Sequence, residues 1–252
     1  MPKLAPAYPL ESVDRALRLI ALLQAGETLT VSSAAEILGV VPSTAHRLLG
    51  ALCYREFAAQ DDARRYVAGP SISPITNALT ASMPRASAAP GLHEIYAALG
   101  ETTHLMVLRG THIQFIDGIE ADHVLRVGLR VGGTMPAYCS AGGKAMLAAL
   151  PVAEVRALHR GGLPEWPTAK VSTADGLDRM LALVRQTGYG VNIEETEVGV
   201  CGIGAAITDA RGRPVAAFTI AVPLPRYDHR KIAEVGAVIR HASEQTARRL
   251  AG

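Results

Sequence analysis

The stretch Thr30–Cys53, TVSSAAEILGVVPSTAHRLLGALC, predicts two short helices joined by a tight turn. Ser33 and Glu36 fit the S-x-x-E capping box that begins a helix. Gly39 fits a helix end, because glycine adopts positive φ without steric cost. Pro42 can then occupy the first turn of the second helix, where its missing N–H removes no hydrogen bond. The stretch is therefore typical of a helix-turn-helix.

The second helix of this stretch has an apolar stripe and a polar face. The stripe recurs at helical spacing and consists of Ala45, Leu48, Leu49 and Leu52. The polar face carries small hydroxyls, a histidine and an arginine, which suit close approach to phosphates and base edges. The same pattern also occurs in helical proteins that do not bind DNA. We predict that the stretch binds DNA through Ser32, Ser33, Pro42, Ser43, Thr44, His46 and Arg47.

The flanking sequence completes a winged helix-turn-helix. A preceding helix is expected from Ser12, as its N-cap, to Gly26, and a hairpin is expected over Phe57–Val67. Arg64 and Arg65 lie in this hairpin and are predicted to contact phosphate or the minor groove. An ordinary surface hairpin would also carry two solvated arginines, so the prediction depends on the helices before it.

Composition indicates a folded protein of one or two domains. The chain has 252 residues, of which 49% are hydrophobic and 19% are charged. Its three widely spaced cysteines argue against a disulfide framework, and no segment resembles a signal peptide or a membrane span, so we expect a cytoplasmic protein. Residues 1–70 carry seven basic and seven acidic residues, so DNA binding requires basic side chains to share one face.

A domain boundary is predicted after the winged helix-turn-helix. This domain covers residues 1–70, a linker helix covers 71–89 with breaks at Pro84 and Pro90, and a second domain covers 90–252. The second domain alternates hairpins with helices, which indicates a mostly antiparallel sheet flanked by helices, an α+β fold. Its expected strands are 103–109, 112–119, 124–127, 191–194, 202–208 and 215–222, and its expected helices are 92–99, 140–150, 151–160, 173–186 and 229–250.

The run Ser140–Lys144, SAGGK, is the sharpest local feature of the second domain. Ser140 fits a helix N-cap, and the nearly side-chain-free residues after it leave first-turn N–H groups exposed, where the helix dipole favours an anion. Close packing of the helix against the sheet explains the small residues equally well. Small or neutral polar residues in apolar strands are suited to lining a cavity for such a ligand, namely Asn192, Cys201, Gly202 and 219–221.

Two other classes of function fit parts of the sequence. A metal or redox sensor would use Cys139, Cys201 or a set whose spacing matches no standard ligand pattern: His104, His112, Asp117, Asp122 and His123. An enzyme acting on a small acid would need a polar pair in the cavity. The sequence contains no G-x-S-x-G, no Walker loop and no H-E-x-x-H. We therefore predict no catalytic residue, no metal and no cofactor.

Several motifs occur together, in order along the chain. They are VDRALRLIALL (13–23), SSAAEILGVVPSTAHRLLGAL (32–52), RYVAG (65–69), MPAYCSAGGKAMLA (135–148) and GVCGIGAAITDARGRPVAAFTIAVP (199–223). In these motifs, and over nearly its whole length, the chain resembles the IclR family of bacterial transcriptional regulators.

The resemblance implies a homodimeric or homotetrameric repressor or activator that binds a pseudo-palindromic operator in double-stranded DNA. It also implies a GAF- or profilin-like effector-binding domain that takes a small, often carboxylated or aromatic, metabolite. Asn192 stands where many members carry an acidic residue, Ala221 where many carry a serine, and Gly202 where many carry a cysteine. These differences make the pocket less polar than in such members, which favours a larger or more apolar ligand such as an aromatic acid. The resemblance implies a pocket formed by Met135, Ala141, Gly142, Asn192, Gly202, Thr219 and Ala221. The local patterns described above add Ser140 and Cys201 to the predicted effector-binding residues.

Overall fold

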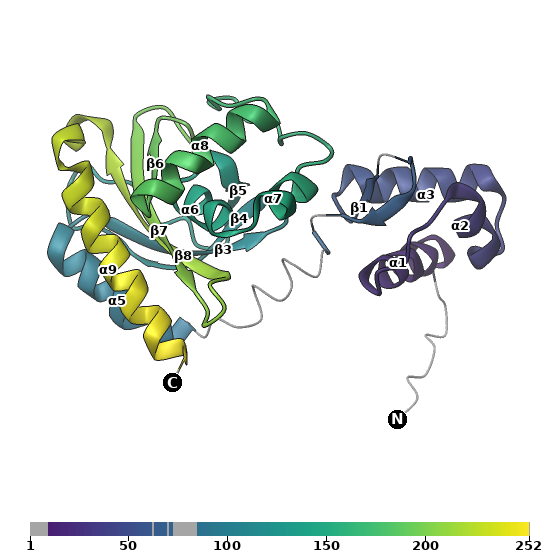
Figure 1. Cartoon of the computed structure of the whole chain (residues 1–252), viewed down its shortest axis with the longest axis horizontal. Helices are drawn as coiled ribbons and strands as arrows, with labels where there is room; N and C mark the ends of the chain where they lie inside the picture. The colour runs from purple at the N-terminus through teal and green to yellow at the C-terminus, as the bar shows by residue number, and fades with distance from the viewer. Residues whose placement is uncertain (1–9, 62, 70, 73–84, 252) are drawn as a thin grey trace. The chain divides into compact units, whose positions relative to one another are not determined.

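The chain forms two compact units, Met1–Thr76 and Asn77–Gly252. A computed structural model describes residues 10–61, 63–69, 71–72 and 85–251. Figure 1 draws the first unit in purple and blue and the second from blue through green to yellow. No helix within these described ranges is both long and apolar enough to cross a membrane.

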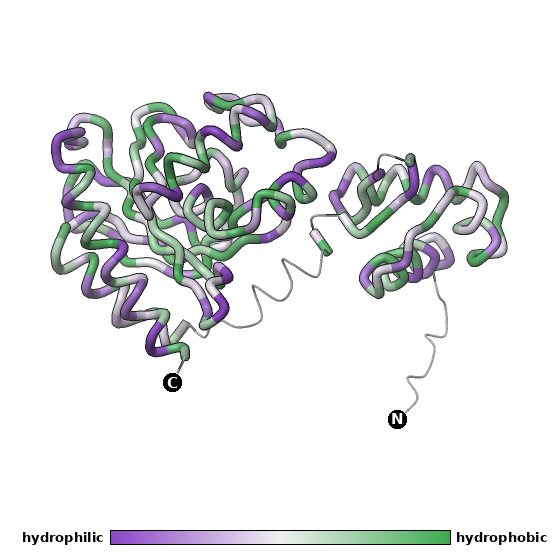
Figure 2. Tube along the Cα trace, viewed as in Figure 1, coloured by the Kyte–Doolittle hydropathy of each residue, from purple (hydrophilic) through white to green (hydrophobic). Residues whose placement is uncertain are grey.

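The described residues of the first unit form three helices and a two-stranded hairpin, so the predicted winged helix-turn-helix is confirmed. Its elements are α1 (Glu11–Gln24), α2 (Val31–Leu38), α3 (Pro42–Tyr54), β1 (Ala58–Gln60) and β2 (Tyr66–Ala68). Figure 2 shows hydrophilic and hydrophobic residues side by side along these helices, as expected of amphipathic helices. Their apolar faces meet in one core, which includes Leu19, Leu23, Leu49 and Tyr66.

The capping of α2 differs from the prediction. The Thr30 hydroxyl accepts a hydrogen bond from the Ser33 N–H at 3.1 Å, and the Ser33 hydroxyl accepts one from the Thr30 N–H at 2.8 Å. The capping box is therefore Thr30–Ser33, and the predicted box of Ser33 and Glu36 is wrong by one turn. Gly39 ends the helix at φ 63° and Pro42 begins α3, as predicted.

Two expectations about helix boundaries are wrong. Helix α1 begins at Glu11 after Leu10, which makes no side-chain cap bond, so Ser12 is not its N-cap. Pro90 does not break the chain but lies inside α5 (Arg85–Leu99). Burial explains this helix, because its residues Ala88, Leu92 and Ile95 are at most 2% exposed and their packing offsets the lost N–H bond.

Part of the predicted linker lies outside the described residues. Residues 73–84 belong to that part, and residues 85–89 belong to α5. A linker helix over 71–89 therefore stays a prediction.

The second unit is a six-stranded antiparallel sheet with helices on both faces, so the predicted α+β fold is confirmed. The strand order is β5-β4-β3-β8-β7-β6. The strands are β3 (Thr102–Arg109), β4 (His112–Ile119), β5 (Thr134–Pro136), β6 (Gly190–Ile193), β7 (Val200–Thr208) and β8 (Pro214–Pro223). The helices after α5 are η1 (Ala137–Cys139), α6 (Ala141–Ala149), α7 (Val152–Leu158), α8 (Ala174–Thr187), η2 (Leu224–Arg226), η3 (His229–Lys231) and α9 (Ile232–Ala251).

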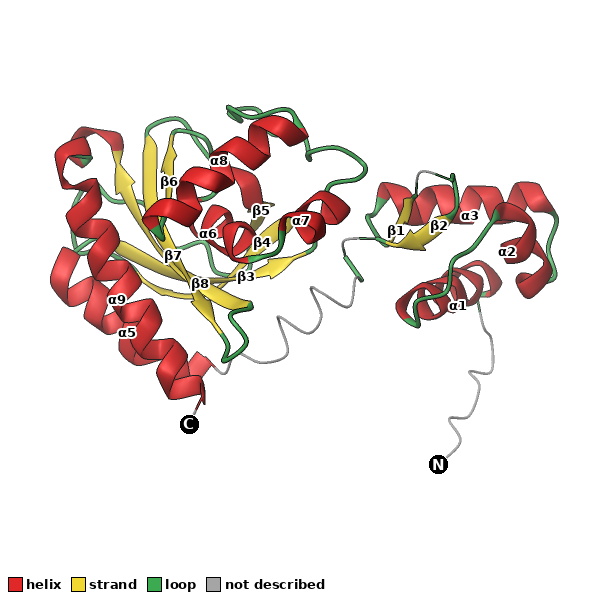
Figure 3. Ribbon diagram, in the orientation of Figure 1, coloured by secondary structure: helices red, strands yellow, loops and turns green. Residues whose placement is uncertain are grey.

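The alternation of side chains along the strands separates the two faces of this sheet. Leu105 and Ile203 point into the core beneath α5 and α9, so His104 and Gly202, one position away, point to the opposite face. Helix α6 covers that opposite face, and Figure 3 shows the sheet between the two groups of helices. The approach is close, because a Cβ atom on Gly204 would lie 2.7 Å from the backbone nitrogen of Gly142.

Residues 124–127 do not form the predicted strand. The Thr102 hydroxyl donates to the Val127 carbonyl at 2.6 Å and accepts from the Ala121 N–H at 3.1 Å, and Arg226 donates to the Leu125 carbonyl. These side chains satisfy backbone groups that a neighbouring strand would otherwise satisfy. The edge of the sheet is instead β5, which pairs with β4.

Candidate functional site

The exposed face of α3 carries most of the predicted DNA-contacting side chains. Because Ala45, Leu49 and Leu52 are buried in the core, Ser43, His46 and Arg47 are exposed and Thr44 is partly exposed. Among the described residues Arg47 is in no ion pair, whereas arginines elsewhere in this unit are paired with Glu11 and Asp61. The guanidinium of Arg47 is thus exposed on the polar face of α3.

Three further predicted contacts lie at the starts of α2 and α3. Ser32 and Pro42 are exposed there. The Ser33 hydroxyl bonds to the Thr30 backbone on both sides, since it accepts from the Thr30 N–H and donates to the Thr30 carbonyl at 3.1 Å. Ser33 therefore positions α2, and its hydroxyl is already engaged.

The two predicted wing arginines differ in their surroundings. Arg64 is exposed at the hairpin turn, with φ 57°. Arg65 pairs with Asp61, with 2.8 Å between its guanidinium nitrogen and the Asp61 carboxylate. A hydrogen bond from the Arg65 N–H, followed by the Arg65 side chain, lowers the pKa of Asp61. Arg65 is therefore engaged by Asp61, whereas Arg64 forms no ion pair with the residues that the structure describes.

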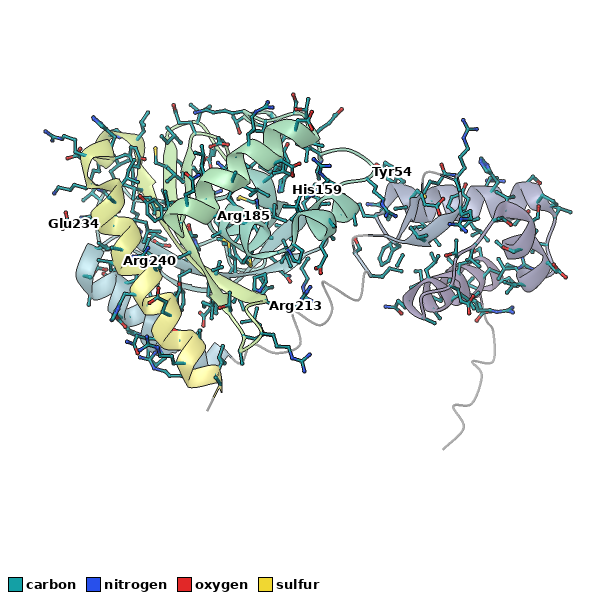
Figure 4. All side chains as sticks on the ribbon, in the orientation of Figure 1. Tyr54, His159, Arg185, Arg213, Glu234 and Arg240 are labelled. Atoms are coloured by element: carbon teal, nitrogen blue, oxygen red, sulfur yellow. The ribbon has the colours of Figure 1, made fainter. Side chains whose placement is uncertain are left out.

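Sequence reasoning missed Tyr54 at the end of α3, which Figure 4 labels. Its side chain is 81% exposed, and its ring centroid lies 5.2 Å from the guanidinium carbon of Arg55. The sequence signal for an exposed aromatic side chain was that Tyr54 lies two residues after Leu52, and therefore off the apolar stripe that enters the core.

A cavity of about 30 Å³ lies between the sheet and the start of α6. Of the nine residues predicted to bind a ligand, Gly142 is outside it, because a Cβ at Gly142 would meet the Met106 sulfur at 2.7 Å. Close packing against the sheet therefore explains that glycine. The other eight line the cavity: Met135, Ser140, Ala141, Asn192, Cys201, Gly202, Thr219 and Ala221.

Seven lining residues were not predicted. Two of them, His104 and Met106, can be inferred from the alternation of side chains along β3 once one face of that strand is assigned to the core. The loop residues Arg130 and Thr196 have no such periodic pattern. The seven are His104, Met106, Phe115, Arg130, Thr196, Val200 and Ile220.

Most polar groups of the cavity wall bond within the protein. The Ser140 hydroxyl accepts from the Gly143 N–H at 3.0 Å and caps α6, as predicted. The Asn192 amide donates to the Thr196 hydroxyl at 2.8 Å, and its oxygen accepts from the Glu195 N–H at 2.8 Å. The Thr219 hydroxyl donates to the Ile203 carbonyl at 3.0 Å.

His104 is the exception in this wall. It is 1% exposed, and neither ring nitrogen has a partner at strict hydrogen-bonding geometry, although the Gly128 backbone lies close enough to oppose the lowering of the His104 pKa. Its ring packs on Phe115 with 4.9 Å between centroids. Burial, and then the charge of Arg130, lower the pKa of His104 to about 4, so the imidazole is neutral at pH 7.

The cavity adjoins an open hollow of about 560 Å³, which shares Phe115, Arg130, Met135 and Thr196 with it. Arg130 and Glu197 form an ion pair at 2.6 Å between the two loops around this mouth. The Trp166 indole also lines the hollow and donates to the Thr196 carbonyl at 2.9 Å.

A buried ion pair anchors the loop that carries Thr196. The Lys144 ammonium lies 2.6 Å from the Glu195 carboxylate and donates to the Val191 carbonyl at 2.7 Å. Burial lowers the pKa of Lys144, and the Glu195 charge opposes that shift. The pair ties α6 to the cavity wall.

The alternative chemistries gain no support from the arrangement. Burial raises the pKa of Cys139 to about 11 and also raises that of Cys201, which disfavours reactive thiolates. Within the described part of the chain, no three side chains of the His, Cys, Asp or Glu type come together in a metal-binding group. The His–Asp set of the metal-sensor alternative is therefore not assembled in the described residues: Asp122, for instance, accepts a hydrogen bond from the Tyr96 hydroxyl at 3.0 Å.

Both units match known protein families. Residues 12–62 match the IclR helix-turn-helix domain, and residues 76–248 match the bacterial transcriptional regulator IclR C-terminal domain. The transcriptional repressor IclR of Escherichia coli is 29% identical, over 96% of this chain and 90% of its own length. The regulator Rv1719 of Mycobacterium tuberculosis is 31% identical, over 94% and 92%. The crystal structure of Thermotoga maritima IclR covers 97% of this chain and 100% of its own, with a TM-score of 0.63 and 26% identity.

Proposed function

Because the chain belongs to the IclR family of bacterial transcriptional regulators, it is a DNA-binding regulator and not an enzyme, and we propose that a small carboxylated effector in its second unit sets its affinity for DNA. The cavity at the start of α6 is the observation that carries this proposal. We also infer that the protein acts in the cytoplasm as a homodimer or homotetramer.

The proposed DNA interface is the exposed face of α3 with the tip of the wing. Arg47 holds a phosphate, while Ser43, Thr44 and His46 face base edges in the major groove. Arg64 contacts phosphate or the minor groove. Two copies related by a two-fold axis would place two α3 helices on the half-sites of a pseudo-palindromic operator.

The proposed effector site combines an anion-binding helix start with apolar walls. Ala141 lines the cavity at the first turn of α6, where the positive end of the helix dipole favours a carboxylate. Met106, Phe115 and Met135 supply apolar surface suited to an aromatic acid. At about 30 Å³ the cavity holds little more than water, so a metabolite must widen it. Binding then selects a more open state, which links the effector to a conformational change.

Two linked titrations test this proposal. A panel of aliphatic and aromatic acids is screened for those that raise the melting temperature, since a ligand selective for the native state stabilises it. Fluorescence anisotropy then measures the affinity for genomic DNA fragments that the wild-type protein selects, with and without the stabilising acid. We expect the acid to change this affinity. An acid that binds while the DNA affinity stays constant would contradict the proposal.

A further inference from the structure

The polar groups around the cavity fall into two classes. Ser140, Asn192 and Thr219 already bond to protein atoms. His104 has no such partner, and Arg130 pairs with Glu197, whose side chain is 58% exposed. The hydrogen-bonding capacity that is left for a ligand therefore lies at His104 and Arg130.

An unpartnered buried imidazole is costly, because it has lost water without gaining a protein partner. A neutral imidazole presents one N–H donor and one nitrogen acceptor. His104 lines the cavity beside the apolar side chains of Met106 and Phe115. A hydroxyl or carboxyl oxygen on a ligand would satisfy it.

Arg130 stands at the boundary between the cavity and the outer hollow, since it lines both. Its side chain is 26% exposed, whereas that of Glu197 is 58% exposed. An ion pair with so exposed a partner is weak, so Glu197 is easily replaced by a ligand anion that approaches from the cavity side. The planar guanidinium suits a carboxylate.

We propose that His104 and Arg130 form a second polar subsite, which selects acids that carry a second oxygen function, a hydroxyl or a second carboxylate, away from the carboxylate bound at α6. The ligand takes the place of Glu197 on Arg130 and supplies the hydrogen bond that His104 lacks. The proposal rests on the effector function proposed above and specifies the chemical class of that effector.

A purely structural role of the Arg130–Glu197 ion pair predicts a different effect of substituting its two residues. If the Arg130–Glu197 pair only held the two loops together, removing either partner would change ligand binding in the same direction. In the subsite, Arg130 attracts the ligand and Glu197 competes with it. Arg130→Gln should therefore weaken binding, while Glu197→Gln should strengthen it.

The experiment compares matched acids on the full chain. The probes are benzoate, meta-hydroxybenzoate and isophthalate, with butyrate and succinate as an aliphatic pair. Binding is followed by melting temperature and by the fluorescence of Trp166, which is the single tryptophan of the chain and lies at the mouth. The variants are Arg130→Gln, Glu197→Gln, His104→Leu and His104→Gln. Arg156→Gln is the matched control, because Arg156 pairs with Asp178 outside the cavity.

We expect the acids with a second oxygen to bind wild type about tenfold more tightly than their parent acids, as one charge-assisted hydrogen bond allows. Arg130→Gln and His104→Leu should remove this preference, His104→Gln should restore part of it, and Arg156→Gln should leave it intact. The ligand-free His104→Leu protein should melt no lower than wild type, because neither ring nitrogen loses a hydrogen bond of good geometry.

Three results would overturn the subsite. Equal affinities for parent and substituted acids would do so while leaving the carboxylate effector intact. A large fall in the melting temperature of ligand-free His104→Leu would assign His104 a structural role. Failure of every acid to bind wild type would remove the carboxylate effector, and the subsite with it.

Discussion

Single residues that act through local backbone chemistry were the easiest to interpret from sequence. Gly39, Pro42 and Ser140 take the predicted positions, because positive φ, a missing N–H and an N-cap hydroxyl are properties of one residue and its neighbours. His104 was assigned to a possible metal set instead. The role proposed for His104 depends on the lack of a well-placed hydrogen-bond partner for its ring nitrogens, and the spacing of residues in the sequence does not reveal this.

Arg47→Ala should weaken DNA binding by a similar factor on all sequences and lower the slope of log affinity against log salt by about 1, because one phosphate contact is lost. The measurement is anisotropy over a salt series. Arg15→Ala is the control, since Arg15 is already paired with Glu11. Equal losses in the two variants would assign the effect to bulk charge.

His104 should make the second unit less stable in acid. Its pKa rises from about 4 when folded to 6.5 when unfolded, so below pH 6.5 the unfolded chain binds a proton that the folded chain excludes. The free energy of unfolding should fall by about 3 kcal/mol between pH 6.5 and pH 4 from this residue. Urea unfolding followed by Trp166 fluorescence measures it. His104→Leu should flatten this part of the profile, and an unchanged profile in His104→Leu would contradict the assignment.

Whole elements could be predicted where a pattern was long or capped. The hairpin of β7 and β8 and the capped helix α8 have nearly the predicted bounds. Residues 124–127 (VLRV) are mostly apolar and include two valines, which favour a strand, but side chains from distant segments satisfy their backbone. Pro90 signalled a break, but tertiary packing of α5 overrides it. Both errors arise because contacts distant in sequence outweigh a local signal.

The two capping boxes for α2 can be distinguished by substitution. Thr30→Ala should destabilise the helix by about 1 kcal/mol, because the Ser33 N–H loses its acceptor. Glu36→Ala should change stability by less than about 0.5 kcal/mol. Hydrogen exchange of the α2 amides measures both. A larger effect of Glu36→Ala would restore the capping box predicted from sequence.

The contact between α6 and the sheet depends on Gly204. In Gly204→Ala the new Cβ would lie 2.7 Å from the Gly142 nitrogen and 2.8 Å from the Phe218 carbonyl oxygen, so α6 must shift. We expect a loss of about 1–3 kcal/mol in the stability of the second unit, measured by Trp166 fluorescence. Gly161→Ala is the control, because no atom lies within 4 Å of its added Cβ. Equal stability of the two variants would show that α6 packs against the sheet less closely than the distance at Gly204 indicates.

The whole molecule combines a DNA-binding unit with a unit that contains a small cavity. The division into two units and the α+β fold follow from motif order and alternation, and eight of the nine predicted ligand residues do line one cavity. The loops around the mouth of the cavity could not be predicted, because Arg130 is far in sequence from Thr196 and Glu197 and no local pattern indicates that these residues come together. Under the proposed function, a ligand that widens the cavity would shift the second unit toward a more open state.

The central claim is that occupation of this cavity changes the affinity for DNA. The most direct measurement is the dissociation constant for a selected operator fragment, with and without a saturating acid that raises the melting temperature of the second unit. The account predicts a change of at least about fivefold, in the range typical of allosteric coupling. The same dissociation constant with the acid demonstrably bound would contradict it.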